Sequence, residues 1–222
     1  MKNPSKNASL PQNRARELRT ELARKIASFV GSAEKLITTN TPGLMLSRRT
    51  APTAPTSVAF EPSLAVVAQG RKRIDLGRTT FIFDQSRFLL TSLDLPVISQ
   101  VIEARKEVPY LGFLLKLEMP VVRELLSREE IQAPEAPSDS PAMATGETTA
   151  ELLDACCRLV DLLDTPQDIP FLSGLIQREI IYRILGDVRG RAFGRLPRWE
   201  IRANGRQKRL RGSGRTTRSR YE

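Results

Sequence analysis

The sequence predicts an α+β domain that is mainly β, with one helix before the strands and a helical region after them. Three observations support this class. Apolar residues recur at helical spacing over Asn13–Val30, short β-rich runs fill about 42–118, and helical spacing returns over about 120–185. The middle region shows no alternation of strands with helices, so we do not expect a parallel sheet.

The first helix is predicted over Asn13–Val30, with Gly31 as its stop signal. Residues 1–16 are polar and basic, and we expect them to form a flexible N-terminus before a domain over 17–185. One apolar stripe of the helix should pack against that domain; its members are Leu18, Leu22, Ile26, Phe29 and Val30.

The middle region reads as closely spaced antiparallel strands that close into a sandwich or a barrel. Gly70, Gly77 and the polar Asp84–Ser86 segment separate successive runs, as turns of hairpins do. Alternation predicts that Ile74, Leu76, Phe81 and Phe83 share an inward face. The predicted strands are Leu44–Arg49, Ser57–Phe60, Ser63–Gln69, Arg71–Leu76, Thr79–Asp84, Arg87–Thr91, Val97–Ile102 and Tyr110–Leu117.

The helical region is predicted to hold a short helix over Pro120–Arg128, a loop over Ala133–Gly146 and two longer helices. A capping-box pattern at Thr148–Glu151 starts the first long helix, and Thr165-Pro166 ends it. The last helix is apolar around more than half of its surface, which is typical of a helix that also contacts a second subunit. The candidate dimer-interface residues are Leu172, Leu175, Ile176, Ile180 and Ile184.

Inward-facing aromatic and aliphatic residues of the β region have two interpretations. They either line a pocket for a small organic effector or simply pack the core that every small barrel needs. The candidate pocket residues are Phe60, Val66, Ile74, Phe81, Phe83 and Phe113.

The composition argues against an enzyme. The chain has no histidine, which removes the imidazole base, the Ser-His-Asp and Cys-His pairs, and His-ligated metals. We therefore expect no metal and no cofactor. Cys156 and Cys157 are neighbours on a helix and point to different sides, so Cys156 is expected to act as a small core residue. No secretory signal or membrane-spanning run is recognisable, and a cytoplasmic location is expected.

The positive charge is concentrated at the C-terminal end. Residues 186–222 hold twelve of the 35 basic and three of the 25 acidic residues, a net charge of +9 out of +10. This segment is rich in Arg and Gly and has no helical or strand period, so we expect it to be disordered. A second candidate function follows, in which this tail binds nucleic acid nonspecifically through phosphate contacts.

Three segments resemble the N-terminal domain of AraC-type transcription regulators: Glu61–Arg73, Leu89–Val101 and Leu163–Leu185. The resemblance implies a cupin-like antiparallel β-barrel over about 42–118 that senses an effector. It also implies a helical region over about 120–185 that mediates dimerisation, and a C-terminal DNA-binding unit. That unit needs on the order of a hundred residues of periodic helix. Residues 186–222 are too few, so we expect this chain to lack it.

Two hypotheses follow for this C-terminal end. The first hypothesis is that the tail is a frameshifted remnant of the DNA-binding region. A helix-turn-helix encoded in another reading frame of the downstream DNA would support it. The second hypothesis is that the chain forms a homodimer, or a heterodimer with an intact relative. Specific DNA binding by this chain is doubtful.

Overall fold

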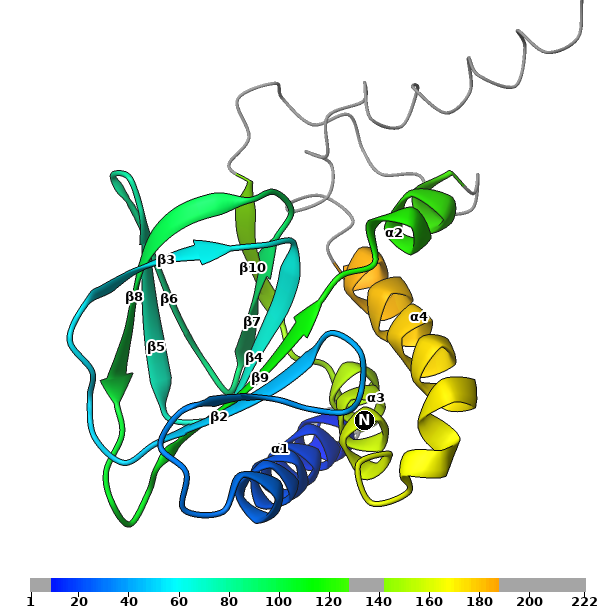
Figure 1. Cartoon of the computed structure of the whole chain (residues 1–222), viewed down its shortest axis with the longest axis horizontal. Coiled ribbons are helices and arrows are strands. Elements are labelled where there is room, and N and C mark those ends of the chain that lie inside the picture. Colours follow the sequence, from blue (N-terminus) through cyan, green and yellow to red (C-terminus); the bar gives the residue numbers. More distant parts are fainter. Residues whose placement is uncertain (1–8, 128–141, 188–222) are drawn as a thin grey trace, which may run out of the picture.

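A computed structural model describes residues 9–127 and 142–187 (Figure 1). Half of the predicted flexible N-terminus, part of the predicted loop over Ala133–Gly146, and nearly all of the basic tail lie outside these residues. The described helices are α1 (Ser9–Val30), α2 (Met119–Leu126), α3 (Ala150–Asp161) and α4 (Ile169–Asp187), with a 3-10 turn over Pro166–Asp168. The described strands are β1 (Leu36–Thr38), β2 (Leu44–Arg49), β3 (Thr56–Phe60), β4 (Ser63–Gln69), β5 (Arg71–Leu76), β6 (Thr79–Asp84), β7 (Arg87–Thr91), β8 (Leu95–Glu103), β9 (Tyr110–Lys116) and β10 (Met143–Glu147).

The strands form two antiparallel sheets. The larger has the order β1-β2-β9-β4-β7-β10, and the smaller has the order β3-β8-β5-β6. Every strand pair within these sheets is antiparallel, as predicted. Over residues 9–127 and 142–187, no ladder joins one sheet to the other, so the described part has two open sheets. The closed barrel that the resemblance implies is not seen there.

The larger sheet separates two hydrophobic cores. Because successive side chains of a strand point to opposite faces, Leu44 and Leu46 of β2 pack toward the helices, whereas Met45 and Ser47 face the smaller sheet. The helix-side core also contains the buried residues of α1, α3 and α4. A smaller core lies between the sheets, and Ile74 and Phe83 belong to it, as the alternation predicted.

The helices α1, α3 and α4 pack together against the outer face of the larger sheet (Figure 1). The α1 helix ends where predicted: Gly31 adopts φ +59°, and its N–H donates to the carbonyl of Ala27 at 3.0 Å. Phe29 was expected in the packed stripe but is 42% exposed, whereas Leu18, Leu22, Ile26 and Val30 are buried. At the start of α3, Thr149 is the N-cap residue, and its hydroxyl accepts from the N–H of Leu152 at 3.2 Å.

Three details differ from the expectation. Residues 9–16 lie within α1, so the helix starts earlier than predicted. The short edge strand β1 was not predicted. The strand β10 occupies part of the segment expected to be a loop, and it pairs with β7 from Met143↔Thr91 to Glu147↔Arg87. Its sequence, MATGE, has no clear apolar alternation, so it gives no local signal for a strand. The strand is held at the edge of the sheet by backbone pairing with β7.

The α4 helix is fixed to its surroundings by polar contacts. Glu179 accepts from Arg158 of α3 at 2.6 Å, and Arg178 donates to Glu124 of α2 at 2.6 Å. Gln177 is buried and donates to the carbonyl of Pro42 at 2.9 Å. These contacts determine which side of α4 faces the domain and which faces solvent. Among the described helices, none is long and apolar enough to span a membrane.

Candidate functional site: a cavity between the sheets

A cavity of about 520 Å³ lies between the two sheets. This volume is within the usual range for small-molecule sites, roughly 300–1,000 Å³. Strands of both sheets contribute: β2, β4 and β9 on one side, and β3, β5 and β8 on the other. Its apolar lining is formed by Leu36, Met45, Val58, Ala59, Phe60, Ala65, Val101, Phe113 and Leu114.

Gly112 makes room for polar groups on the floor of the cavity. A Cβ atom at this position would lie 2.6 Å from the hydroxyl oxygen of Tyr110 and 2.6 Å from that of Ser47. The Tyr110 ring therefore lies across the glycine, and its hydroxyl shares a hydrogen bond with Ser47. Burial raises the pKa of Tyr110. The hydrogen bond to Ser47 and the charge of Arg49 lower this pKa, but their effect is smaller than that of burial. Tyr110 is thus a neutral hydroxyl group at the cavity wall.

Two cationic side chains enter the cavity from facing sheets. Lys72 comes from the inward-facing side of β5, and Arg49 comes from the inward-facing side of β2. Desolvation, followed by repulsion from Arg49, lowers the pKa of Lys72 from 10.5 to about 8. Lys72 is half-buried and lines the cavity.

The contacts of these two cations include no close carboxylate. The Lys72 ammonium lies 5.5 Å from the centroid of the Phe60 ring, a cation–π distance. Arg49 donates to the carbonyl of Arg48 at 2.9 Å and influences Glu34 only electrostatically. Within residues 9–127 and 142–187, neither cation forms an ion pair with an acidic side chain. Among the described residues, no carboxylate is paired with the positive charge on this part of the wall.

A third cation of the cavity is compensated. Lys116 of β9 donates to Glu61 at 2.8 Å, and both residues line the cavity. Hydrogen bonding and attraction to Glu61 raise the pKa of Lys116, and Asp94 and Glu118 add to the effect. Arg49 pairs with Tyr110 in the sheet, six residues along β9 from Lys116, which is roughly 20 Å. The Arg49 and Lys116 parts of the cavity are therefore separate.

The structure does not bring all predicted pocket residues together. Phe60 and Phe113 border the cavity. The group Ile74, Phe81 and Phe83 packs between the sheets without lining it. Val66 lies on the other face of β4, in the helix-side core, because its neighbours Ala65 and Val67 take the inward positions.

Sequence reasoning missed the polar residues of the cavity, namely Lys72, Arg49, Tyr110 and Ser47. The signal for Lys72 was present, since it lies two residues before Ile74 on one strand and therefore shares its face. A lysine at a predicted inward position is unusual enough to mark a candidate site. The signal for Arg49 appears only once β2 is paired with β9.

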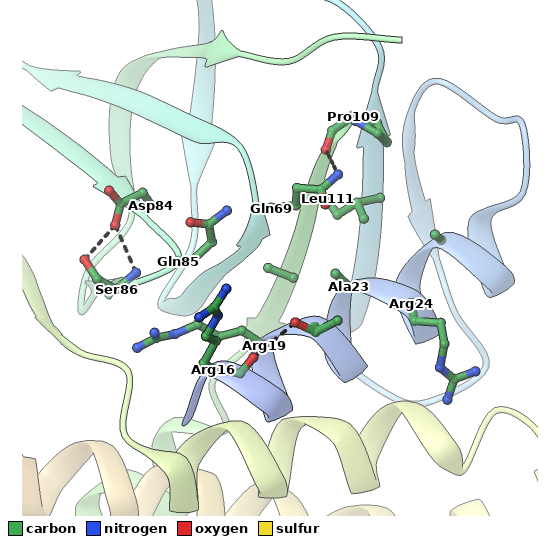
Figure 2. A pocket seen from close by; sticks show the side chains of 13 residues that line it. Arg16, Arg19, Ala23, Arg24, Gln69, Asp84, Gln85, Ser86, Pro109 and Leu111 are labelled. Carbon is green, nitrogen blue, oxygen red and sulfur yellow. Dashed lines mark hydrogen bonds between the residues drawn. The ribbon is translucent and has the colours of Figure 1, made fainter. Parts of the chain in front are cut away.

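A second hollow, an open groove of about 680 Å³, lies between α1 and the turn at Asp84–Ser86 (Figure 2). Figure 2 shows Arg16 and Arg19 on the side of this turn and Arg24 pointing away. Arg19 already donates to the carbonyl and the hydroxyl of Thr148, at 3.4 and 3.3 Å.

The groove is larger than the cavity, but it is a surface hollow whose polar groups largely bond to one another. Asp84 accepts from the N–H and hydroxyl of Ser86, at 2.9 and 2.7 Å, and Gln69 donates to Pro109 at 2.7 Å. A small-molecule site is expected to enclose its ligand between apolar walls. We therefore take the cavity between the sheets as the candidate site.

Other chemistry finds little support in the described residues. Cys156 and Cys157 are free and buried. Burial raises the pKa of the Cys156 thiol, and it raises that of Cys157 to about 12, so neither is a reactive thiolate. In the part of the chain that the structure describes, no cluster of three His, Cys, Asp or Glu residues could hold a metal ion.

The predicted dimer-interface residues separate into two groups. Ile180 and Ile184 are fully buried in the helix-side core, and Ile176 is 9% exposed. Leu172 and Leu175 face solvent, together with Phe171 and Tyr182. The three isoleucines thus serve the fold of the chain itself, since they lie on the side of α4 that covers the domain.

Solved structures of AraC-like proteins are similar to this one. The AraC-like transcriptional activator CuxR matches with 12% identity and a TM-score of 0.41; the alignment covers 69% of this chain and 54% of CuxR. Fatty-acid-bound ToxT from Vibrio cholerae matches with 11% identity and a TM-score of 0.44, covering 81% of this chain and 77% of ToxT. The chain thus spans about half of CuxR. No curated protein matches.

The family assignment comes from the sequence. A family model described as "AraC-type transcriptional regulator N-terminus" matches residues 40–192, more than half of the chain. This range contains both sheets apart from β1, the lining of the cavity apart from Leu36, and the helices α2 to α4. The chain therefore belongs to the family of AraC-type transcriptional regulators, whose N-terminal domain it carries.

Proposed function

We propose that this domain senses a small organic effector, which binds in the cavity between the two sheets. The observation that carries the proposal is the cavity itself: about 520 Å³, lined by apolar side chains together with polar and charged ones. Close-packed protein interiors contain few voids of this size. Regulation requires that the effector bind two arrangements of the protein with different affinity. No catalytic role is proposed for the domain.

The test compares effector binding by the full chain with binding by variants whose cavity is filled. Ala65→Phe places a ring in the cavity from β4, and Ser99→Phe does so from β8. Ser57→Phe is the matched control, because Ser57 is exposed on β3 and does not line the cavity. Cell metabolites are screened by thermal shift and the hits are measured by calorimetry.

We expect at least one metabolite to stabilise the wild type and Ser57→Phe but neither filled variant. Circular dichroism and urea denaturation establish which filled variants fold, and one folded variant is enough. If every hit binds the filled variants as well as it binds the wild type, the cavity is not the effector site.

We further propose that two copies of the chain associate through the exposed stripe of α4. The α4 stripe consists of Phe171, Leu172, Leu175 and Tyr182, whose exposed fractions are 76%, 42%, 65% and 51%. Exposed apolar side chains gathered on one helix in this way are common at subunit interfaces. The ion pairs of α4 with α2 and α3 hold the stripe facing outward.

Analytical ultracentrifugation of Leu175→Asp tests this proposal. We expect the variant to dimerise at least roughly tenfold more weakly, because a charge at the centre of an apolar contact is desolvated. Val108→Asp, an exposed apolar position in the loop before β9, is the control and should leave association unchanged. A dimer that tolerates Leu175→Asp rules out this interface.

The cupin-like barrel remains a prediction of the resemblance.

A further inference from the structure

Resting on the proposed effector site, we propose that the effector is an organic anion whose charged group lies between Lys72 and Arg49 and whose apolar body fills the rest of the cavity. Lys72 reaches the cavity from β5 and Arg49 from β2, so the two sheets each provide one cation. A ligand bound to both connects the two sheets.

The charge distribution carries the first step. Lys72 and Arg49 are close enough to repel each other, and in the described residues no carboxylate forms an ion pair with either. Enclosed like charges without a counterion are unfavourable, and an anion between them relieves both the repulsion and the loss of hydration. A neutral ligand leaves this cost in place. The site therefore favours an anion.

The nearby hydroxyl groups suit the same ligand. The side chains of Tyr110 and Ser47 line the wall next to Arg49, because Arg49 pairs with Tyr110 and Ser47 with Gly112 across the β2–β9 ladder. Their two hydroxyl groups share a single hydrogen bond. One hydroxyl hydrogen remains available to an acceptor such as a carboxylate oxygen.

The other charged part of the cavity sets the ligand's orientation. Lys116 is held by Glu61, and Asp94 and Glu118 lie close enough to raise its pKa. These carboxylates repel a second anion. The ligand therefore has one anionic group, at Lys72 and Arg49, rather than one at each end.

The remaining walls define the ligand's body. Met45, Val58, Phe60, Ala65, Val101 and Leu114 present carbon atoms to the cavity. A sugar phosphate would place many hydroxyl groups against these carbon atoms, and a dianion would place a second charge there, away from the two cations. An aliphatic or aromatic monocarboxylate satisfies both parts of the wall.

The experiment uses the full chain and two matched series of probes. The first series is n-alkanoates of about six to twelve carbons, which a cavity of this size encloses. The second is 1-alkanols of the same lengths, which keep the apolar body and lose the charge. Binding is measured by calorimetry at pH 7, with thermal shift as a second readout. The variants are Lys72→Met, Arg49→Met and Lys106→Met.

We expect at least one alkanoate to bind roughly tenfold or more tightly than its alkanol, the difference typical of charge-assisted pairing. Lys72→Met and Arg49→Met should each weaken alkanoate binding roughly tenfold and leave alkanol binding unchanged. Lys106→Met is the matched control, because Lys106 is exposed and does not line the cavity, and it should not weaken alkanoate binding.

Two results overturn the inference. The first is that alkanols equal alkanoates in affinity, and the second is that alkanoates bind Lys72→Met and Arg49→Met as well as they bind the wild type. If neither series binds, the anion inference is also wrong. In each case the metabolite screen with the filled variants still decides separately whether the cavity binds any effector.

Discussion

Replacing Lys72 by methionine is expected to stabilise the protein at neutral pH. The substitution keeps an unbranched side chain of similar length and removes the charge. The fall in the pKa of Lys72 from 10.5 to about 8 corresponds to roughly 3 kcal/mol of destabilisation by its charged form. Loss of the cation–π contact with Phe60 offsets about 1 kcal/mol. The net gain in the free energy of unfolding is about 2 kcal/mol.

The pH dependence provides a sharper test than the gain itself. Below pH 8, Lys72 is protonated in both the folded and unfolded states, so the wild type bears the full cost of the charge. Between pH 8 and 10.5 the folded state releases the proton first, and the wild type becomes more stable as the pH rises. The advantage of Lys72→Met is therefore largest below pH 8 and declines as the pH approaches 10.5.

Urea denaturation followed by circular dichroism at pH 7 and pH 10 measures both quantities. Lys106→Met is the control, because Lys106 is exposed in the loop between β8 and β9 and its removal should change little at either pH. If Lys72→Met is less stable than the wild type at pH 7, or if its advantage is the same at both pH values, Lys72 is not a desolvated cation. The electrostatic basis of the anion site is then lost.

Three further predictions follow from the fold. Gly70→Ala should lower the free energy of unfolding by about 3 kcal/mol in urea denaturation, because φ is +87° and the new Cβ would lie 2.5 Å from the Glu103 carbonyl oxygen. Gly77→Ala is the control: its φ is +58° but the space around it is open, so the loss should be about 1 kcal/mol. Equal losses for the two variants contradict this reasoning. Thr149→Ala should cost about 1 kcal/mol through loss of the α3 cap, and no change in the urea midpoint contradicts that role. Cys157 should react with a thiol reagent only after unfolding, since burial raises its pKa to about 12, and rapid labelling of the native protein at pH 8 contradicts this.

Most strand boundaries could be predicted because each strand carries its own local signals. Gly70 and Gly77 mark the turns around β5, and both adopt positive φ in the structure. The strand β10 could not be predicted in this way, because it depends on hydrogen bonds to β7, which lies more than fifty residues earlier. Its own sequence contains no period that distinguishes it from a loop.

The candidate site was predicted only in part. Aromatic residues were expected to line a pocket, and Phe60 and Phe113 do border the cavity. Val66 was assigned to it because it is apolar and lies in a strand, but its face depends on which neighbours point inward, and these are Ala65 and Val67. A run of buried residues on both faces of a central strand hides the alternation that would have shown this.

The sequence by itself determined the order and type of nearly all elements, the antiparallel character of the sheets and the family. These properties depend on local periodicity, turn residues and long matching segments. Only the tertiary structure decided that Lys72 and Arg49 meet in one cavity, that Glu61 neutralises Lys116, and that α4 buries Ile180 while exposing Leu175. The physical reason is that charge compensation and burial depend on distances between side chains, and strands far apart in the chain set these distances only when they pair and pack.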